Sequence, residues 1–382
     1  MNKPKLAVIG NGMAGIRTVE ELLKIAPDKY EITVFGSEPH PNYNRILLSP
    51  VLAGEQTIKD IVLNDWDWYK DNGINLITGK TITEIHRTRR ELKTDTGEVF
   101  SYDRLLIATG SNPFILPIEG KSLPGVISYR DIADTEAMIG AAKRYKKAVV
   151  IGGGLLGLEA ANGLKLRGMD VTVVHVMPWL MERQLDEKAG KLLQASLEVK
   201  MRAQTETLIA GESGRVAALR FKTGEQIPAD LVVMAVGIRP NTALAEKSGL
   251  QVSARPGGIV VNDTMQTLTD PRIYSVGECV NHRGTAYGLV APLFEMAKVC
   301  ANHLAEYGIG RYVGSVTSTK LKVTGVDLFS AGNFQGGDDT EDIVLSDPMA
   351  GVYKRLVIKD DKLVGACLYG DTVDGSWYFK LL

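Results

Sequence analysis

Two short glycine motifs follow apolar runs in the 382-residue sequence. Residues 5–15 read KLAVIGNGMAG, and residues 147–157 read KAVVIGGGLLG. In each motif a β-branched run predicts a buried strand, GxGxxG predicts a tight turn, and a helical pattern follows. Backbone amides at such a turn and at the start of the helix can bind a pyrophosphate. The sequence therefore predicts two dinucleotide-binding units of the same design.

The glycines of each motif have separate steric roles. The first allows the tight turn, the second lets the backbone approach the pyrophosphate, and the third allows close packing of the helix. In that order they are Gly10, Gly12 and Gly15 in the first motif, and Gly152, Gly154 and Gly157 in the second. A second apolar strand follows each helix, at residues 32–35 (ITVF) and 171–174 (VTVV), and completes a βαβ unit. A structural tight turn without a ligand is the alternative interpretation.

Charge and composition exclude several classes of protein. The 44 basic and 45 acidic residues leave a net charge of −1 with no strongly basic block, which argues against nucleic acid or an anionic membrane as partner. The longest apolar stretches are about half the length that spans a bilayer. The N-terminal run has no signal-peptide cleavage pattern. We therefore expect the N-terminal run to be a first strand, and the cysteine usage described next indicates the reducing cytoplasm.

The cysteine pattern excludes further chemistry. Cys279, Cys300 and Cys367 are far apart in the sequence and form no CxxC pair. This argues against a zinc ribbon, a self-contained iron–sulfur site and an adjacent redox dithiol, so we expect no bound metal. We expect Cys300 and Cys367 to pack in a core. Cys279 is expected to pack in the same way, with a place beside a cofactor as the alternative.

The remaining pattern predicts an α/β fold with two Rossmann-like domains. Residues 102–110 and 231–241 look like strands that cross between these domains. From about residue 311, short alternating strands with a turn at Asp360 and Asp361 predict a small antiparallel sheet with a flanking helix. We expect the first domain to be discontinuous (1–112 and 238–310), the second to be inserted (113–237), and a small α+β domain to follow (311–382).

The order of these motifs resembles a known superfamily. GxGxxG, ATG at 108–110, GxGxxGxE, GIRPN at 237–241 and IYSVGE at 273–278 are similar to the flavoprotein disulfide reductases with two dinucleotide-binding domains, across essentially the whole chain. Longer strings, PNYNRILLSPVL, VMPWLMERQLD, STKLKVTGVDLFSAGNF and LVGACLYGDTVDGSWYFKLL, most resemble the N-terminal flavin module of NAD(P)H nitrite reductase large subunits, and next the rubredoxin reductases. The resemblance implies FAD in the first domain and NAD(P)H in the second.

The resemblance also implies which residues contact FAD. Glu38 would reach the ribose, because Gly36 stands where an acid is usual, and Arg45 would stabilise negative charge on the reduced flavin. A solvated surface position is the alternative for Glu38, and a surface ion pair is the alternative for Arg45. Glu278 stands where the family usually has Asp. The full set expected at FAD is Gly10, Gly12, Ala14, Gly15, Glu38, Arg45, Thr109, Gly110, Gly277 and Glu278.

At the nicotinamide nucleotide, Glu159 would approach the nicotinamide end. An acid favoured at any helix start is the alternative for Glu159. His175 follows the second strand and favours neither the 2′-hydroxyl of NADH nor the 2′-phosphate of NADPH, and Arg183 lies eight residues further on. By resemblance NADH is expected, with NADPH as the alternative. The expected set is Gly152, Gly154, Leu155, Gly157, Glu159, His175 and Gly237, and Arg45 and Glu159 are the two expected catalytic residues.

Departures from the resemblance narrow the expected function. The sequence has no cysteine before position 279, so the thiol chemistry of several family members lacks its nucleophile. The cysteines that hold siroheme and iron–sulfur clusters are also absent, and Pro50 follows Ser49 where oxygenase-type ferredoxin reductases commonly have lysine. We expect an NAD(P)H-dependent FAD oxidoreductase of nitrate or nitrite assimilation that passes electrons to a protein. An NADH oxidase that uses O₂ and a non-catalytic redox sensor are the alternatives.

The expected partner is a small redox protein, such as a rubredoxin or ferredoxin, or a siroheme/iron–sulfur reductase subunit. Four basic residues of the C-terminal module, Lys320, Lys322, Lys354 and Arg355, could form a patch that steers an acidic carrier. Solvated strand faces are the alternative for this patch. The same module could pack against a second copy of the chain in a homodimer.

Overall fold

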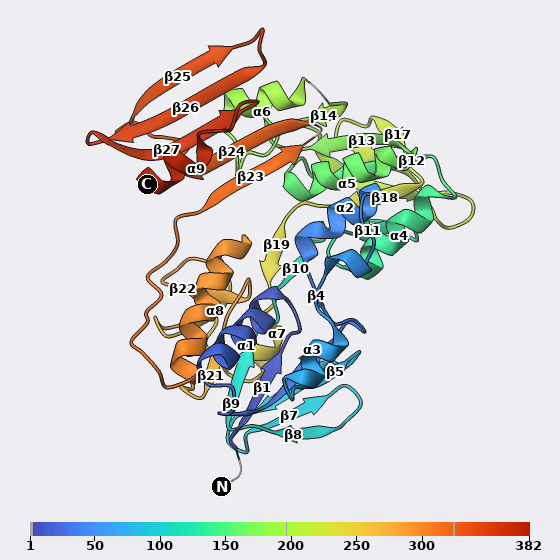
Figure 1. The fold of residues 1–382 in the computed structure, drawn as a ribbon. Coiled ribbons are helices and arrows are strands. Elements are labelled where there is room, and N and C mark those ends of the chain that lie inside the picture. Colours follow the sequence, from blue (N-terminus) through green and yellow to red (C-terminus); the bar gives the residue numbers. More distant parts are fainter. Residues whose placement is uncertain (1–2, 196, 324) are drawn as a thin grey trace. The chain divides into compact units, whose positions relative to one another are not determined.

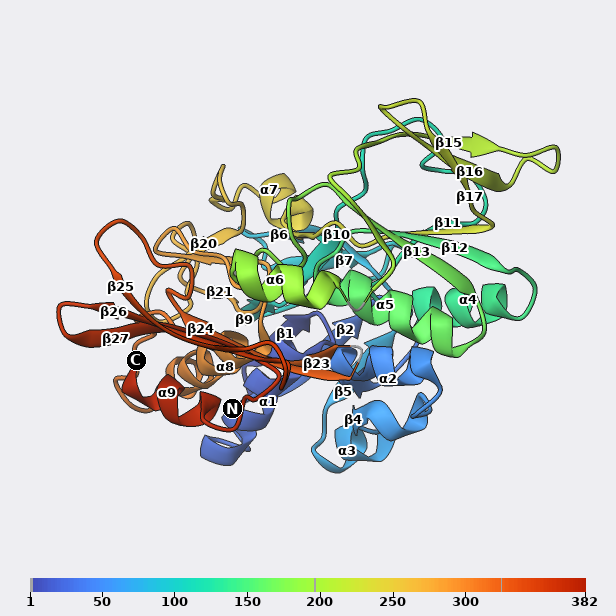
Figure 2. The same ribbon diagram turned by 90° about the horizontal axis from the view of Figure 1, so that it is seen from above.

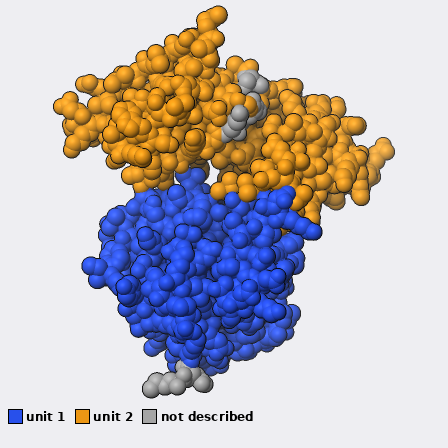
Figure 3. All heavy atoms as spheres, in the orientation of Figure 1, with its two compact units in different colours: residues 1–45, 59–112, 238–315 blue, residues 46–58, 113–237, 316–382 orange. Residues whose placement is uncertain are grey.

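The computed structural model describes residues 3–195, 197–323 and 325–382, shown as a ribbon in Figure 1. The chain divides into two compact units, coloured separately in Figure 3. Unit 1 comprises Met1–Arg45, Lys59–Asn112 and Ile238–Ser315, and unit 2 comprises Ile46–Ile58, Pro113–Gly237 and Val316–Leu382. The short segment Ile46–Ile58 therefore belongs to the unit that contains the second glycine motif.

A parallel five-stranded sheet with the order β21-β9-β1-β2-β5 lies at the centre of unit 1. Its strands are β1 (Lys5–Ile9), β2 (Glu31–Gly36), β5 (Asn75–Thr78), β9 (Arg104–Ile107) and β21 (Ile273–Ser275). The apolar run before the first glycine motif becomes β1, and only Lys5 of that strand is exposed. After the motif, α1 (Met13–Ile25) packs against α8 (Val290–Leu304). The first glycine turn thus connects a buried strand to a long packed helix.

The other elements of unit 1 are short. An antiparallel sheet contains β6 (Ile82–His86), β7 (Glu91–Thr94) and β8 (Val99–Ser101). Three two-stranded sheets pair β3 (Asn42–Tyr43) with β4 (Val62–Asn64), β10 (Ser111–Pro113) with β19 (Ile238–Pro240), and β20 (Ile259–Val261) with β22 (Val280–His282). The last residue of β10, Pro113, belongs to unit 2. The helices are α3 (Trp66–Asp71) and α7 (Ala243–Lys247), with the 3₁₀ turns η1 (Arg45–Leu47), whose last two residues belong to unit 2, and η2 (Lys59–Ile61).

Unit 2 repeats the design of unit 1. Its parallel sheet has the order β11-β18-β12-β13-β14, formed by β11 (Val126–Ser128), β12 (Lys147–Ile151), β13 (Asp170–His175), β14 (Val199–Met201) and β18 (Leu231–Met234). Its helices are α2 (Leu48–Ala53), α4 (Ile132–Ala142), α5 (Leu155–Leu166) and α6 (Glu187–Gln194), and β15 (Thr205–Ala210), β16 (Val216–Phe221) and β17 (Gln226–Pro228) form an antiparallel sheet. The α5 helix follows the second glycine motif, and α2 packs on it.

The C-terminal part of unit 2 is an antiparallel sheet with the order β23-β24-β27-β26-β25, and Figure 2 shows α9 beside it. The elements are β23 (Ser318–Val323), β24 (Val326–Gly332), β25 (Glu341–Asp347), β26 (Val352–Lys359), β27 (Lys362–Tyr369) and α9 (Gly375–Leu381). Asp360 and Asp361 join β26 to β27 and both have positive φ, as a two-residue hairpin turn that matches the strand twist requires. The predicted α/β fold, with two Rossmann-like sheets and a small C-terminal sheet, is confirmed.

The two ends of α8 (Val290–Leu304) have separate structural causes. Pro292 lies in the first turn, where proline is tolerated because its position needs no intrahelical N–H donor. At the other end, Glu306 has a φ of 55° and ends the helical path. None of the described helices combines the length and apolar character that crossing a membrane would need.

Candidate cofactor sites

The first glycine turn in unit 1 leaves no room for side chains at two positions. Gly10 has a φ of 116°, and a Cβ there would lie 2.1 Å from the carbonyl oxygen of Ala108. A Cβ at Gly15 would lie 2.6 Å from the carbonyl oxygen of Gly10. The turn is therefore held between β1 and the residue that follows β9, and the roles predicted for these two glycines agree with the geometry.

Gly12, in contrast to Gly10 and Gly15, has open space where a side chain would lie. It is the N-cap residue of α1, and a Cβ built on it would have no described atom within 4 Å. Among the described residues, no side chain caps α1, whereas Asp65 caps α3 by accepting a hydrogen bond from the amide of Trp68. Backbone amides at an open helix start attract an anion. The unit 1 turn therefore fits a pyrophosphate, and a side chain at position 12 would fill the space.

The predicted residues near the end of β9 lie close to other parts of unit 1. Thr109 Oγ1 donates to the carbonyl of Asn241 at 2.8 Å, and the carbonyl of Gly110 accepts from the amide of Asn241 at 2.9 Å. Ser111 Oγ donates to Glu278 at 2.7 Å. The exit from β9 is thus fixed to the residues that return from unit 2.

Gly277, which precedes Glu278, packs directly on the first motif. Its φ is 95°, and a Cβ at this position would lie 3.1 Å from the Cβ of Ala14. The structure therefore places Ala14, Gly277 and Glu278 at the start of α1, together with the glycine turn. This matches the predicted grouping of the IYSVGE segment with the first motif.

Glu38 and Arg45, both predicted at FAD, form an ion pair with each other. Glu38 also accepts a hydrogen bond from Tyr43 Oη at 2.6 Å, and the Arg45 guanidinium lies 4.9 Å from the centre of the Tyr43 ring. Each charged side chain is about one-quarter exposed. Arg45 is thus held by Glu38 and Tyr43, and the surface ion pair that was the alternative for Arg45 is present.

A hydrogen-bond network that was not predicted fixes Asn11, the residue between the first two glycines of the first motif. Asn11 Nδ2 donates to the carbonyl of His40 at 3.1 Å, and Tyr69 Oη donates to Asn11 Oδ1 at 2.6 Å. A Cβ at Gly36 would lie 2.9 Å from the Cβ of Asn11. The missing acid at position 36 therefore has a steric reason, because the Asn11 side chain occupies that space.

The second glycine turn has the same geometry as the first. Gly152 has a φ of 121°, and a Cβ there would lie 2.2 Å from the carbonyl oxygen of Ala235. A Cβ at Gly157 would lie 2.0 Å from the carbonyl oxygen of Gly152. Gly154 is the N-cap of α5 with Leu155 as the first helical residue, and its Cβ position has no described atom within 4 Å. Unit 2 therefore holds a second cradle that fits a pyrophosphate.

Glu159 lies one turn into α5 and has a partner that the sequence did not reveal. Ser49 Oγ on α2 donates to Glu159 Oε2 at 2.6 Å, and Tyr129 Oη lies 3.2 Å from Ser49 Oγ. Burial raises the pKa of the Glu159 carboxyl, and the hydrogen bond from Ser49 partly opposes this shift. Burial also raises the pKa of Tyr129.

His175 is buried at the end of β13 and faces the second glycine turn. Its Nδ1 accepts a hydrogen bond from the amide of Gly153 at 3.0 Å. Its Nε2 lies 3.0 Å from the carbonyl of Trp179 and 3.2 Å from a Glu182 carboxylate oxygen. Glu182 was not predicted as a site residue, although the absence of an acid at position 175 was a signal that another one was needed nearby.

Gly237 ends the middle segment of unit 2, with a φ of 116°, and its carbonyl accepts a hydrogen bond from the amide of Phe114 at 2.8 Å.

The basic patch predicted on the C-terminal module is partly neutralised by acidic side chains. Lys354 pairs with Asp371 at 2.7 Å, and Arg355 pairs with Asp342 at 2.7 Å. The side chain of Lys322 lies outside the described residues.

The three cysteines are all fully buried. Cys279 Sγ lies 3.3 Å from the carbonyl of Val276 and 3.4 Å from Ser275 Oγ. Burial raises the pKa of Cys300, and burial is also the main reason why the pKa of Cys367 rises to about 12. All three thiols therefore pack in the interior.

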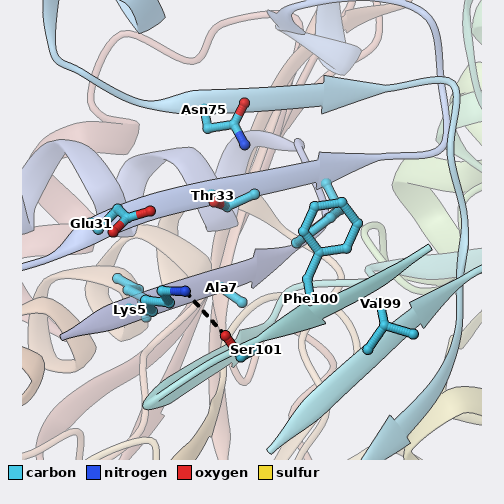
Figure 4. Close-up of a pocket in the computed structure, with 10 residues that line it drawn as sticks. Lys5, Ala7, Glu31, Thr33, Asn75, Val99, Phe100 and Ser101 are labelled. Atoms are coloured by element: carbon cyan, nitrogen blue, oxygen red, sulfur yellow. Dashed lines mark hydrogen bonds between the residues drawn. The ribbon is translucent and has the colours of Figure 1, made fainter.

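A cavity of about 220 Å³ lies on the central sheet of unit 1 (Figure 4). Figure 4 shows Lys5, Glu31 and Asn75, the first residues of β1, β2 and β5, at this cavity, and Lys5 Nζ donates to Ser101 Oγ at 3.2 Å. The glycine turn instead follows the carboxyl end of β1. None of the predicted site residues lines this cavity.

Family models match both parts of this architecture. The pyridine nucleotide-disulphide oxidoreductase model matches residues 4–300, and the model of the rubredoxin NAD+ reductase C-terminal domain matches residues 318–382. The chain belongs to the pyridine nucleotide-disulphide oxidoreductase family. Members of this family bind FAD and use NAD(P)H, so the predicted cofactors are confirmed at the level of the family.

Comparison with individual proteins indicates the same family. The chain is 53% identical over 387 residues to the nitrite reductase [NAD(P)H] of Bacillus subtilis (strain 168), covering 100% of this chain and 47% of that protein. It is 48% identical over 377 residues to the assimilatory nitrate reductase electron transfer subunit of the same strain, covering 98% and 48%. The chain spans about half the length of these relatives.

A solved structure, that of the covalent putidaredoxin reductase–putidaredoxin complex, matches with a TM-score of 0.89 and 25% identity, over 99% of this chain and 93% of that chain. The resemblance predicted from the motifs is thus confirmed.

Proposed function

We propose that the chain is an electron-transfer flavoprotein of nitrate or nitrite assimilation, which takes electrons from NADH and passes them through FAD to a protein acceptor. The observation that carries this proposal is the pair of open cradles, one in each unit. Each consists of a glycine with positive φ and a helix start that no described side chain caps, with room beside its N-cap glycine. Two such cradles accommodate two dinucleotides, as a reaction between FAD and NADH requires.

We assign FAD to residues 1–112 and 238–310 and NADH to residues 113–237. FAD, when bound, supplies the chemistry that converts a two-electron hydride donor into a source of single electrons. The amides at the start of α1 would bind the FAD pyrophosphate, and those at the start of α5 would bind that of NADH. Glu38 would bind the FAD ribose while Tyr43 and Arg45 hold its carboxylate.

Glu159 would act at the nicotinamide end. Its buried carboxyl, hydrogen-bonded to Ser49, can hold a proton at a pH where an exposed glutamate would have lost it. Arg45 would act through its ion pair with Glu38, which holds that carboxylate at the ribose. These roles need no nucleophile, and the three buried cysteines offer no accessible thiol for disulfide chemistry.

The acceptor in this proposal is a small redox protein or a siroheme/iron–sulfur reductase subunit. The rubredoxin reductase-type module at residues 318–382 and the name of the Bacillus electron transfer subunit support a protein acceptor. The C-terminal module, here 311–382, would provide the docking surface, or a surface for a second copy in a homodimer. Both the free, buried cysteines and this reaction fit a reducing cytoplasm.

Anaerobic stopped-flow spectroscopy tests this function. The purified protein with FAD is mixed with NADH and then with oxidised rubredoxin, ferredoxin or the siroheme subunit. Rapid bleaching at 450 nm followed by rapid reoxidation by one carrier supports the proposal. If only O₂ reoxidises the flavin, the protein is an oxidase, and if bleaching is slow with both nucleotides, a redox sensor is the better explanation.

A further inference from the structure

The end of β13 lacks the acid that would recognise a ribose, and the His175 ring does not replace it. Because Nδ1 accepts the amide hydrogen of Gly153, the ring proton of neutral His175 is on Nε2. A Cβ at Gly153 would lie 2.8 Å from Cγ of His175, so the ring fills the space above the glycine turn. His175 is thus a fixed donor whose Nε2–H points away from the turn.

Two acceptors face this donor, the carbonyl of Trp179 at 3.0 Å and the carboxylate of Glu182. The distance from His175 Nε2 to Glu182 Oε2 is 3.2 Å, and the Glu182 side chain is 24% exposed. The hydrogen bond from His175 is the main reason why the pKa of Glu182 is lowered, so this carboxylate is ionised at neutral pH. A partly exposed negative charge therefore stands beside the end of β13, seven residues later in the sequence than the usual position.

The backbone that carries Glu182 is held in an unusual conformation. Met181, directly before it, is fully buried and has a φ of 54°. Its amide donates to the carbonyl of Gly153 at 2.9 Å. A non-glycine residue in this region costs of the order of 1 kcal/mol or more, and such costs are typical of functional sites. The strained turn ties Glu182 to the same glycine loop that His175 contacts.

The C-terminal sheet holds the other side of this turn. Gln335 Nε2, after β24, donates to the carbonyl of Glu182 at 3.0 Å. Four residues further on, the buried Asp186 caps α6 by accepting from the amide of Ala189 at 2.9 Å, and it accepts from Tyr353 Oη at 2.6 Å. The segment from Glu182 to Asp186 is therefore fixed from two directions within unit 2.

We propose that Glu182 is the residue that selects NADH, by accepting hydrogen bonds from the ribose diol next to the adenine and repelling a 2′-phosphate. His175 and Gln335 are positioning residues: His175 contacts the carboxylate of Glu182, and Gln335 holds the backbone carbonyl of Glu182. This inference rests on the proposed NADH site in unit 2 and adds its selectivity. The neighbouring Arg183 is exposed and is the residue that would instead favour NADPH.

Binding of NAD⁺ and NADP⁺ to the FAD-loaded protein, measured by titration calorimetry, tests the proposal without relying on turnover. Wild type should bind NAD⁺ more tightly than NADP⁺. Glu182→Gln should weaken NAD⁺ binding about tenfold or more, the effect of one lost hydrogen bond to a charged group, and should narrow the difference between the two nucleotides. Gln335→Ala should change binding in the same direction by a smaller factor. Arg183→Gln is the matched control and should leave NAD⁺ binding unchanged.

The proposal is overturned if Glu182→Gln keeps the wild-type ratio of affinities while its melting temperature and FAD content are normal. It is also overturned if wild type prefers NADP⁺ and Arg183→Gln abolishes that preference. Glu182→Asp, which keeps the charge, serves if the Gln variant does not fold, and it should retain the preference for NAD⁺. A wild-type protein that binds NAD⁺ selectively but is not reduced by NADH would contradict the proposed function and leave this inference intact.

Discussion

The hydroxyl of Ser49 donates a 2.6 Å hydrogen bond to the carboxylate of Glu159. The two residues are 110 positions apart and meet because the short segment Ile46–Ile58 belongs to unit 2, where α2 packs on α5. The Arg167 side chain, which follows α5, adds hydrogen bonds to the carbonyls of Val51 and Leu52. The neutral hydroxyl of Ser49 therefore helps to fix the position and the pKa of the expected catalytic carboxyl.

Replacing Ser49 with alanine should change the titration of Glu159. The hydrogen bond from Ser49 lowers the pKa of this carboxyl, so its loss should raise that pKa further and move the pH profile of flavin reduction by NADH to higher pH. The free energy of unfolding should fall by about 1 kcal/mol. Ser122→Ala, at an exposed position of the same unit, is the control. An unchanged pH profile for Ser49→Ala would contradict a role for this pair.

Glu159→Gln should alter the pH dependence of stability. The folded-state pKa of Glu159 is raised by burial, so its contribution to stability is fully present below the unfolded pKa and is lost as the pH rises through the folded pKa. Each pKa unit of separation corresponds to ~1.4 kcal/mol. The variant should therefore gain stability relative to wild type as the pH rises from 4 to 8. Denaturant unfolding across this range measures the difference, and a constant difference would refute the raised pKa.

Gly12→Ala and Gly154→Ala should show which cofactor each cradle binds. Neither added methyl group meets a described atom within 4 Å, so each should cost folding no more than about 1 kcal/mol through the weaker helix cap. Each methyl group would nevertheless occupy the space assigned to a pyrophosphate. We expect Gly12→Ala to lose FAD, and Gly154→Ala to retain FAD but to bind NADH at least tenfold more weakly.

Absorbance of bound flavin and NADH titrations measure these two effects. Gly140→Ala is the matched control, because its Cβ position in α4 is also open and the substitution should leave both cofactors bound. If Gly154→Ala lost FAD while Gly12→Ala kept it, the assignment of the two cofactors would have to be exchanged.

The glycine motifs could be located from sequence because their geometry depends on neighbours in the chain. Strand, turn and helix follow one another within about a dozen residues, and Gly10 and Gly152 have the expected positive φ. The small C-terminal sheet could be predicted for the same reason, since alternation and the Asp360–Asp361 turn are local signals. Contacts between residues that are far apart in the sequence had no such local signal.

The contacts that complete the site depend on tertiary structure. Ser49 reaches Glu159 only because α2 belongs to unit 2. Arg45 forms an ion pair with Glu38, and no spacing rule indicates this pair. Glu182 reaches the end of β13 only because Met181 adopts a left-handed conformation. Each of these relationships depends on how a loop folds back. The domain limits and the site residues expected from sequence stay predictions for the experiments above.

The three thiols should be unreactive in the folded protein. All are fully buried, and burial also raises the pKa of Cys300 and Cys367. A thiol reagent such as DTNB at pH 8 should label no cysteine of the native protein and three after denaturation. Rapid labelling of one thiol in the native state, with loss of NADH-dependent flavin reduction, would instead favour thiol chemistry.

The most direct test of electron transfer is a double-mixing stopped-flow experiment under anaerobic conditions. NADH should bleach bound FAD within the mixing time or shortly after, and one added protein carrier should reoxidise it far faster than air does. Gly154→Ala at the same NADH concentration should bleach slowly, which would link the reduction to the unit 2 cradle. If wild type bleaches slowly with both NADH and NADPH, or if no carrier competes with O₂, the account of this protein as an electron-transfer flavoprotein is wrong.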